Sequence, residues 1–475
     1  MSLANALRSG SKDVVGKVAD HLSPAVAKFA VCLQPVIADR AEGSYVWTTD
    51  GQKHLDMSGG IGVTSTGHCH PRVVKAIQEQ AAKFIHAQQN VFTASVPQVA
   101  LLDKLRDICP EQLTRFFFCN SGSEAVENAI KIARGHTKKQ NIIAFENGFH
   151  GRTMGAMALT TSKTYYRANF GPLMPGVFIA PYPYCLHCKA RQASPSGNDW
   201  YTVEPCMPGF RMNYNDRQCC NGPLEAVKWM LTQQSAPSET AAMIIEPILG
   251  EGGFLTPPPS YLRGLRELCT QHNILLIIDE VQSGVGRTGK WWGHEHMDGV
   301  DADIMTFAKG IGSGFPMAGV ATREDTFDGI AAGQLGGTYG GSVLGAAAAC
   351  ATLDVIREEG LLENANERGA QLVKGLMQLQ QQFPIIDVRG RGLMVAIEFG
   401  GTDGSLSAKY GTAAAITKAA VKRNMLLLSA GARETIRFLP ALNVKAEEID
   451  QALNILADCL EEVFGSEAQP ATAVA

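Results

Sequence analysis

Seven short runs of apolar residues lie between residues 115 and 321, and helical or loop sequence separates each run from the next. The runs span residues 115–119, 141–145, 177–180, 242–245, 274–278, 304–308 and 317–321. Polar residues do not alternate with apolar ones inside them, which is typical of strands covered by helices on both faces of a parallel sheet. We therefore expect an α/β fold whose large domain holds a seven-stranded, mainly parallel sheet.

Shorter elements flank this sheet on both sides. Residues 44–57 alternate like a β-hairpin around Asp50-Gly51, and a helix is expected to begin at Pro71. The later elements expected are an alanine-rich helix after residue 345, a helix over about 361–380, strands near 385–389 and 393–399, and closing helices. Both chain ends should therefore share a smaller α+β domain. The expected division is 1–85 for its N-terminal part, 86–345 for the large domain and 346–475 for its C-terminal part.

The composition is that of an ordinary globular protein and excludes several classes of function. The formal net charge of −4 gives no electrostatic footprint for nucleic acid, and no basic block predicts binding to a membrane surface. No apolar run approaches the roughly 18 residues that a membrane-spanning helix needs. Arg8, Lys12 and Lys17 leave an organellar presequence open, although Asp13 and Asp20 count against it. We expect a cytoplasmic protein.

Two of the apolar runs end abruptly in a charged residue. Asp279 follows the run 274–278, and Lys309 follows the run 304–308. In open α/β sheets ligands bind beyond the carboxyl ends of the strands, so these two side chains are expected to face one crevice. There a lysine can form a Schiff base and an acid can hold a protonated ring nitrogen.

A candidate anion site follows the first apolar run. Ser121 and Glu124 have the spacing of a capping box, which predicts that a helix begins here. Gly122 and Ser123 would then leave backbone N–H groups at the positive end of the helix, where phosphate groups bind. A capped helix start without a ligand is the commoner meaning of this pattern. Its position at a strand end, in the same sheet as the acid and the lysine, favours the phosphate site.

The glycines of Gly284-Val-Gly-Arg-Thr-Gly289 match the dinucleotide-binding pattern G-x-G-x-x-G. The context differs from that of a nicotinamide site, because residues 279–283 separate the glycines from the strand. Lys290-Trp-Trp-Gly, rather than a helical sequence, follows them. A nicotinamide-dependent oxidoreductase is therefore a distant alternative.

Further motifs lie in order along most of the chain. They are Gly59-Gly-Ile-Gly-Val with Gly67-His-Cys-His-Pro71, Ser121-Gly-Ser-Glu-Ala-Val-Glu, Phe149-His-Gly-Arg-Thr153, Ile245-Glu-Pro-Ile-Leu-Gly-Glu-Gly-Gly253, Asp279-Glu-Val-Gln-Ser-Gly-Val-Gly-Arg-Thr-Gly289, Ala308-Lys-Gly310 and Gly337-Thr-Tyr-Gly-Gly341. With these motifs the chain resembles the class III, omega-amino-acid aminotransferases, which are pyridoxal-phosphate (PLP) enzymes of fold type I. The resemblance implies pyridoxal 5′-phosphate as the cofactor.

The resemblance also implies roles for individual residues around the cofactor. Lys309 matches the Schiff-base lysine, which also moves a proton, and Asp279 matches the partner of the pyridine nitrogen. The other matches are Gly122 and Ser123 for the phosphate, Phe149 and His150 for the aromatic pair near the ring, Val281 for the opposite ring face, Gln282 for the ring hydroxyl, and Thr338 for a phosphate contact from the neighbouring subunit. A homodimer with shared active sites is therefore implied.

Four further matches concern the substrates, and they are similar to those of 4-aminobutyrate aminotransferases. Arg152 matches the arginine that holds the carboxylate distal to the reacting amine, and Ile61 matches an apolar pocket position. Arg437 matches the arginine for the α-carboxylate of glutamate or 2-oxoglutarate, and Glu251 matches the acid that covers it while an omega-amine is bound. The implied reaction converts 4-aminobutyrate and 2-oxoglutarate to succinate semialdehyde and glutamate. Acetylornithine aminotransferase, pyruvate-dependent omega-transaminase and aminomutase activities stay open as alternatives.

Two positions depart from the family pattern. Leu249 stands where many relatives have glutamine, and Ser342-Val343 replaces a common Asn-Pro. The first is close in sequence to Glu251 and the second to Thr338. Differences are therefore expected in the substrate pocket and at the subunit interface.

An irregular segment, 183–221, is rich in cysteine. It holds five of the 12 cysteines of the chain, namely Cys185, Cys188, Cys206, Cys219 and Cys220. Cys185-Leu-His-Cys188 has metal-ligand spacing and resembles the C-x-x-C of some animal relatives that hold an iron–sulfur cluster, but no second C-x-x-C completes a zinc site. We prefer a set of reduced thiols, with one disulfide as a variant, and we assign no metal to the active site. His68-Cys-His70 and His294-Glu-His296 are not expected to bind metal.

Overall fold

The computed structural model describes residues 36–92, 94–187, 205–207, 210–211 and 221–465. The first residues of the chain, where a weakly amphipathic helix is expected and a presequence is left open, lie outside this part. So do the side chains of Cys188, Cys206, Cys219 and Cys220. Two short strands of the cysteine-rich segment, β7 (Pro205–Met207) and β8 (Phe210–Arg211), form an antiparallel pair.

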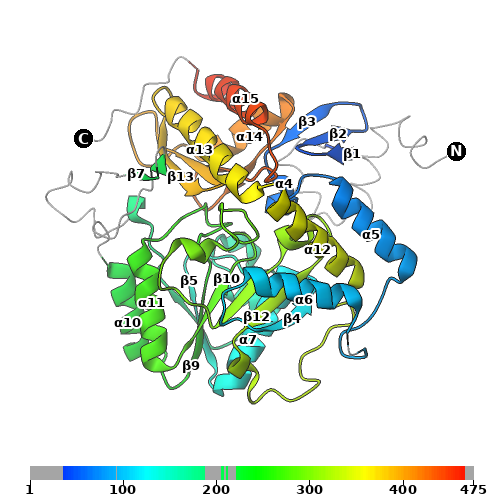
Figure 1. Ribbon diagram of the computed structural model, residues 1–475. Helices are drawn as coiled ribbons and strands as arrows, with labels where there is room; N and C mark the ends of the chain where they lie inside the picture. The colour runs from blue at the N-terminus through cyan, green and yellow to red at the C-terminus, as the bar shows by residue number, and fades with distance from the viewer. Residues whose placement is uncertain (1–35, 93, 188–204, 208–209, 212–220, 466–475) are drawn as a thin grey trace.

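A seven-stranded sheet forms the centre of the larger lobe, in the lower half of Figure 1. Its order is β4 (Arg115–Cys119), β12 (Ala318–Thr322), β11 (Ile304–Phe307), β10 (Leu275–Asp279), β9 (Thr240–Ile245), β5 (Asn141–Phe145) and β6 (Val177–Ala180). Only β12 runs antiparallel to its neighbours. The predicted seven-stranded, mainly parallel sheet is confirmed, and each of the seven apolar runs forms one of its strands.

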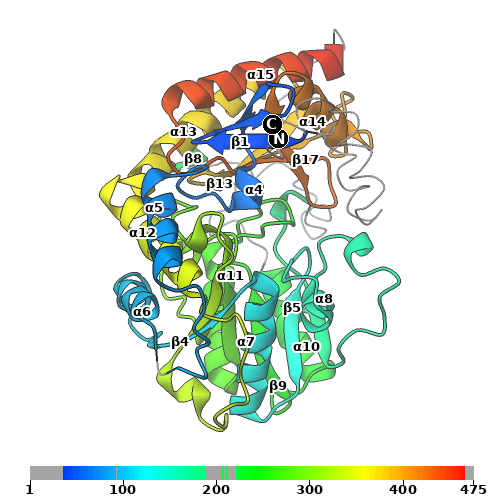
Figure 2. The ribbon, with the colours of Figure 1, turned by 90° about the vertical axis from the view of Figure 1, so that its right-hand side faces the viewer.

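Two separate cores on opposite faces of the sheet explain why the strands lack polar alternation. In β10, Leu275 and Ile277 pack with residues of α7 (Gly122–Thr137), whereas Leu276 and Ile278 pack with residues of α11 (Pro259–His272). All four side chains are buried. Most strand positions therefore hold apolar residues without alternation, because helices cover both faces. Figure 2 shows α7 and α11 separated by the strands.

The smaller lobe contains two four-stranded sheets. One has the order β1 (Ala38–Glu42), β2 (Tyr45–Thr48), β3 (Lys53–Asp56) and β15 (Met425–Leu426), and the other β13 (Ile385–Arg391), β14 (Met394–Phe399), β17 (Thr435–Phe438) and β16 (Leu428–Ala430). The predicted hairpin is the β2–β3 pair, in which Trp47 lies opposite Lys53. Met425 pairs with Leu55, so β15 joins strands from the two ends of the chain in one lobe. The division at residues 85 and 345 stays a proposal.

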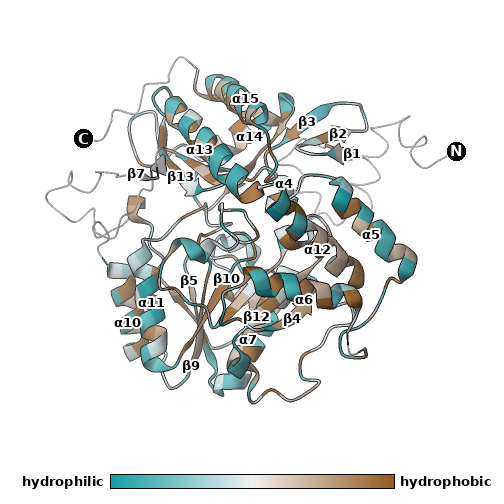
Figure 3. Cartoon of the chain, in the orientation of Figure 1, coloured by the Kyte–Doolittle hydropathy of each residue, from teal (hydrophilic) through white to brown (hydrophobic). Residues whose placement is uncertain are grey.

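Helices surround both lobes, and their polar residues gather on their outer sides (Figure 3). They include α5 (Pro71–Lys83), α6 (Val96–Ile108), α8 (Met154–Leu159), α10 (Gly222–Gln233), α12 (Val343–Glu358), α13 (Leu361–Leu379), α14 (Thr412–Lys422) and α15 (Ala446–Phe464). The expected helices after residues 71, 345 and 361 are α5, α12 and α13. Among the described helices, none has both the length and the apolar character needed to cross a membrane.

Candidate active site

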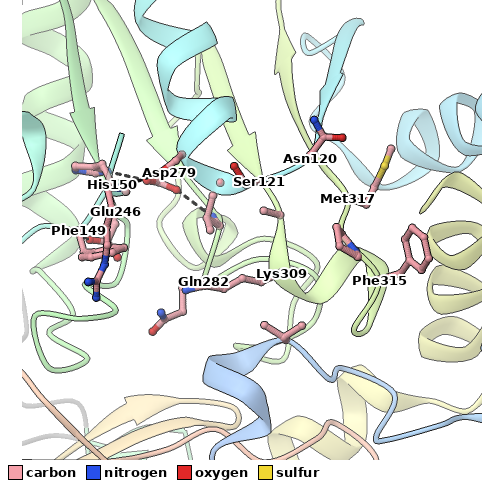
Figure 4. A pocket seen from close by; sticks show the side chains of 18 of the residues that line it. Asn120, Ser121, Phe149, His150, Glu246, Asp279, Gln282, Lys309, Phe315 and Met317 are labelled. Carbon is pink, nitrogen blue, oxygen red and sulfur yellow. Dashed lines mark hydrogen bonds and ion pairs between the residues drawn. The ribbon is translucent and has the colours of Figure 1, made fainter. Parts of the chain in front are cut away.

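The candidate active site lies at the carboxyl ends of β9, β10 and β11, below the smaller lobe (Figure 4). A cavity of about 360 Å³ is present there. The predicted residues that line it are Gly122, Ser123, Phe149, His150, Arg152, Asp279, Val281, Gln282 and Lys309. The strand ends therefore bring together residues up to 187 positions apart in the sequence.

Asp279 is the last residue of β10, and its side chain is almost fully buried. Its Oδ1 accepts hydrogen bonds from the Val281 N–H at 3.1 Å and from the Thr306 hydroxyl at 3.0 Å. Its Oδ2 lies 2.7 Å from Nδ1 of His150. Burial alone would lower the pKa of His150, but the hydrogen bond and the charge of Asp279 outweigh burial and raise this pKa. The aspartate is thus held in one orientation by three partners.

A second buried acid, Glu246, follows β9 directly and also lines the cavity. Its carboxylate accepts backbone hydrogen bonds from Phe149 at 2.8 Å and from Gly250 at 2.7 Å. Burial raises the pKa of Glu246 to about 7, while the charge of His150 opposes this shift. The sequence motifs assign no role to Glu246, although it shows the same signal as Asp279, an apolar run that ends in an acid.

Helix α7 begins at the cavity wall, as the pattern around Ser121 predicts. The Ser121 hydroxyl accepts a hydrogen bond from the Glu124 N–H at 3.3 Å. The Glu124 carboxylate accepts a bond from the N–H of Asn120 at 2.7 Å, so the reciprocal contact of a capping box is displaced by one residue. Gly122 and Ser123 form the first turn of this 16-residue helix, where N–H groups lack helical partners.

The turn after β10 supplies Val281 and Gln282. Val281 packs so closely on the start of α7 that a Cβ atom on Gly122 would lie 2.9 Å from its Cγ1, which explains the glycine. Gln282 is buried, and its Oε1 has no hydrogen-bond partner among the described residues. Buried polar atoms are rarely left unpaired, so this oxygen marks a place for a ligand donor.

Lys309 lies two residues after the end of β11, with a φ of 43°. This left-handed conformation is uncommon for a residue with a side chain and turns the backbone sharply at the cavity. Burial lowers the pKa of the Lys309 amine below its ordinary value, and the charge of Glu251 opposes the shift. A larger fraction of this amine is therefore neutral than of an exposed lysine.

Phe149, Arg152 and Tyr166 form an aromatic and cationic cluster at one side of the cavity. The Phe149 and Tyr166 rings meet edge to face with their centroids 5.1 Å apart. The guanidinium carbon of Arg152 lies 4.3 Å from the centroid of the Tyr166 ring, and the backbone N–H of Arg152 donates to Ser123 Oγ at 2.9 Å. The Arg152 side chain is exposed, so an incoming anion can reach it.

Glu251 and Arg437 form an ion pair between the lobes. Arg437 is on β17 of the smaller lobe, and Glu251 is in the turn after β9. Both are buried, and the Glu251 carbonyl accepts a 2.7 Å bond from the Gly431 N–H. Burial alone would raise the pKa of Glu251. The charge of Arg437 and the hydrogen bond that Arg437 donates outweigh burial and lower this pKa to about 2. The two residues do not line the 360 Å³ cavity, but the charges of both act on the Lys309 amine.

Two other predicted residues, Ile61 and Thr338, also lie outside the cavity lining. Ile61 is 41% exposed and has a φ of 69°, which is strained for a β-branched residue. Thr338 is exposed, and its neighbour Tyr339 is 68% exposed. Within one chain, therefore, the structure does not bring these two side chains to the other site residues.

The remaining sequence features have structural partners. Gly284 to Gly289 lie in turns that no helix follows directly, unlike a dinucleotide-binding loop. His68 is paired with Asp56 at 2.9 Å, and His294 with Glu280 at 2.7 Å. In the described part of the chain no group of three or more potential ligands is placed to hold a metal ion.

The two departures from the family pattern have different environments. Leu249 is buried in the main core, and its N–H donates to the Leu255 carbonyl at 2.9 Å. Ser342 caps α12, because its hydroxyl accepts a bond from the Gly345 N–H at 3.3 Å.

Comparison with known proteins identifies the family. Residues 28–460 match the model of the family described as aminotransferase class-III. The chain belongs to the class-III aminotransferases. It is 40% identical over 435 residues to the 5-aminovalerate aminotransferase DavT of Pseudomonas aeruginosa, an alignment that covers 91% of this chain and 95% of that protein. It is 38% identical over 446 residues to the 4-aminobutyrate aminotransferase GabT of Escherichia coli, with 93% and 97% covered.

Solved structures of aminotransferases share the fold of this class-III member. An (S)-enantioselective omega-transaminase from Thermomicrobium roseum superposes with a TM-score of 0.83 at 28% identity, covering 95% of this chain and 98% of that one. The ornithine aminotransferase of Toxoplasma gondii superposes with a TM-score of 0.79 at 27% identity, covering 98% and 99%. The predicted PLP fold type I, with its large and small lobes, is confirmed.

Proposed function

We propose that this aminotransferase uses pyridoxal 5′-phosphate to transfer the amino group of 4-aminobutyrate to 2-oxoglutarate, giving succinate semialdehyde and glutamate. The observation that carries the choice of substrates is the buried pair between Glu251 and Arg437. While Glu251 neutralises Arg437, the site accepts an omega-amine that has no α-carboxylate. When Glu251 moves aside, Arg437 can bind the α-carboxylate of the acceptor bidentately.

The residues around the cavity fit this cofactor. The first N–H groups of α7, at Gly122 and Ser123, suit its phosphate, and the unpaired Oε1 of Gln282 suits its ring hydroxyl. Asp279 suits its ring nitrogen, and Lys309 its aldehyde carbon. Phe149 and Val281 line the cavity as candidates for the two faces of the ring.

When bound, the protonated pyridine ring supplies an electron sink for the carbon from which the substrate loses a proton. Asp279 would hold the protonated ring nitrogen, and its hydrogen bond with His150, whose pKa is raised, fixes the position of the carboxylate. The Thr306 hydroxyl and the Val281 N–H prevent the carboxylate from turning away. His150 is thereby a positioning residue for Asp279.

The amine of Lys309 is the proposed proton carrier. Its lowered pKa makes the neutral form, which can accept a proton, more abundant at neutral pH. General acid–base work of this kind is typically worth about 10²- to 10⁴-fold in rate. Glu246 holds the Phe149 backbone and the Gly250 backbone, and it therefore positions the aromatic wall and the turn that carries Glu251.

Arg152 is the proposed contact for the distal carboxylate of the donor. Its guanidinium is accessible and lies over the Tyr166 ring, which restricts its orientation. Ile61 is proposed to form an apolar part of the same pocket. The α-carboxylate, which 2-oxoglutarate and glutamate have and 4-aminobutyrate lacks, is assigned to Arg437.

A homodimer with shared active sites is also proposed, with Thr338 reaching the neighbouring phosphate site. An exposed apolar surface supports it, formed by Phe84, Ile85, Val91, Phe92, Val96, Val99 and Tyr339. Asn90 donates to the Leu335 carbonyl at 2.9 Å, and the ring of His86 lies 5.6 Å from that of Tyr339, so the two segments form one surface beside Thr338. Apolar surfaces of this kind mark interfaces. We propose a cytoplasmic enzyme with no nucleic-acid or membrane partner.

A second donor, 5-aminovalerate, is favoured by the 40% identity to the aminotransferase of that name. It is one methylene longer than 4-aminobutyrate. An extra methylene in an apolar pocket changes specificity by only about 10- to 200-fold, so one site can accept both. Acetylornithine, pyruvate as acceptor and an aminomutase reaction remain alternatives.

Single-turnover measurements on the purified holoenzyme test this proposal. We expect 4-aminobutyrate to convert the spectrum of the bound cofactor, and 2-oxoglutarate to restore it. The same measurement with 5-aminovalerate and N-acetylornithine ranks the donors. Conversion by N-acetylornithine without conversion by 4-aminobutyrate would overturn the choice of donor.

A further inference from the structure

Tyr166 lies between two groups that the proposed function assigns to different substrates. It ends a short 3₁₀ helix, Thr164–Tyr166, and only 5% of its surface is exposed. No motif in the sequence singled it out. Its ring contacts Arg152 of the donor carboxylate site, and its hydroxyl contacts Glu251 of the acceptor carboxylate site. The rings of Phe149 and Tyr165 also pack against it.

The ring of Tyr166 contacts the donor side. The guanidinium carbon of Arg152 lies 4.3 Å from its centroid, within the range of a cation–π interaction. The edge-to-face contact with Phe149, at a centroid distance of 5.1 Å and an interplanar angle of 70°, fixes the ring from another side. The ring therefore restricts where Arg152 can present its charge.

The hydroxyl of Tyr166 contacts the acceptor side. It donates to Oε2 of Glu251 at 3.4 Å, while Oε1 of Glu251 is held by Arg437. Burial raises the pKa of the Tyr166 hydroxyl, and the charge of Glu251 adds to this shift, so the group stays a protonated donor. Both oxygens of Glu251 are thus engaged when it covers Arg437.

We propose that Tyr166 is a positioning residue that couples the two carboxylate sites, an inference that rests on the proposed function. Its hydroxyl stabilises Glu251 in the place where it neutralises Arg437, while its ring orients Arg152 for the donor carboxylate. Binding of 2-oxoglutarate requires Glu251 to leave Arg437, and therefore breaks the contact with Tyr166. The residue biases the free enzyme toward the omega-amino donor.

A purely structural role would have a different consequence. If Tyr166 only filled space, replacing it with phenylalanine would leave both half-reactions unchanged, and a larger packing defect would slow both alike. Coupling instead predicts opposite effects on the two half-reactions. The informative quantity is therefore the ratio of kcat/KM for 4-aminobutyrate to kcat/KM for 2-oxoglutarate.

The experiment compares Tyr166→Phe, Tyr166→Leu and a control, Tyr261→Phe, in the holoenzyme. Tyr261 is also a buried tyrosine and donates one hydrogen bond, to the Pro181 carbonyl at 2.8 Å. For Tyr166→Phe we expect kcat/KM for 4-aminobutyrate to fall by about two- to tenfold, as for loss of one ordinary hydrogen bond, and that for 2-oxoglutarate to stay or rise. Tyr166→Leu should also raise the KM for 4-aminobutyrate, because Arg152 loses its support.

The possible outcomes separate the coupling by Tyr166 from the proposed function. Tyr261→Phe should leave the ratio of the two half-reactions at its wild-type value. Equal effects of Tyr166→Phe on both half-reactions, or none on either, overturn the coupling while leaving the proposed function intact. A wild-type enzyme that fails to react with 4-aminobutyrate overturns the proposed function and the coupling together.

Discussion

The two ends of the candidate site are built differently. The cofactor end draws Glu246, Asp279 and Lys309 from the ends of three neighbouring strands of one sheet, β9, β10 and β11. The substrate end pairs Glu251 of the larger lobe with Arg437 of the smaller one, residues separated by 186 positions. In the function we propose, a sheet thus fixes the chemistry, and a contact between two lobes selects the substrate.

This difference suits the task of an aminotransferase. The cofactor must keep one orientation through both half-reactions, and buried partners such as His150 and Thr306 hold Asp279 in place. The substrate end must bind a donor and an acceptor in turn. An ion pair that an incoming carboxylate can displace provides that exchange.

The largest effect is expected for Lys309→Ala, which removes the proposed proton carrier at the cofactor end. Turnover should fall by at least about 10²- to 10⁴-fold, the typical value of general acid–base catalysis. Steady-state kinetics and circular dichroism measure activity and folding together. Lys290→Ala, at an exposed lysine whose amine donates to the Glu295 carbonyl at 2.7 Å, is the matched control. A variant with normal turnover would rule out the mechanism.

Asp279→Asn should be the next largest change. Loss of one charge-assisted hydrogen bond of about 1.5 to 3 kcal/mol predicts a turnover lower by roughly 10- to 150-fold. Asp303→Asn is the control, since Asp303 is also buried but pairs with Arg266 and Arg323 far from the cavity lining. It should lower the melting temperature without a comparable loss of kcat. Equal kinetic losses in the two variants would contradict the special role of Asp279.

A pH-dependent stability is expected from Glu246. Its folded-state pKa is raised to about 7, so its contribution to stability is present below its unfolded pKa, near 4.5, and is lost as the pH rises through about 7. In cofactor-free protein, Glu246→Gln should therefore gain stability relative to wild type between about pH 5 and 8. Urea unfolding at several pH values measures this difference. Glu239→Gln, at an exposed position, should show no such trend.

Thr338→Val is expected to have the smallest effect. Loss of one hydrogen bond of about 0.5 to 1.5 kcal/mol should weaken cofactor binding by roughly two- to tenfold. Hybrid dimers that combine one Thr338→Val subunit with one Lys309→Ala subunit show whether Thr338 contacts the cofactor of its own subunit or of the neighbouring subunit. If Thr338 acts across the interface, each hybrid contains one intact site with wild-type cofactor affinity. If it acts within its own subunit, no intact site forms.

The residues proposed for the cofactor end leave a clearer signal in the sequence than those proposed for the substrate end, for a physical reason. An apolar run of strand length that ends in a charge is visible without any alignment, as at Asp279 and Lys309. Glu246 carries the same signal and was overlooked. The apolar pattern does not encode strand direction, so the antiparallel β12 could not be distinguished from its neighbours.

Contacts between residues far apart in the sequence left no local signal. Tyr166 meets Glu251 across 85 residues, and no spacing rule relates the two positions. Arg437 was found only through the family resemblance, because its strand resembles any buried strand with one charge. Thr338 and Ile61 do not line the cavity of a single chain, so their proposed roles involve surfaces outside it.

The most direct test of the separation between the two ends is the pair of half-reaction rate constants in Glu251→Gln. Without its negative charge, residue 251 no longer neutralises Arg437. We predict that kcat/KM for 4-aminobutyrate falls by about tenfold or more, while that for 2-oxoglutarate stays within about twofold of wild type or rises. An equal fall in both half-reactions would contradict it, since Glu251 would then support the cofactor chemistry and not the choice of substrate.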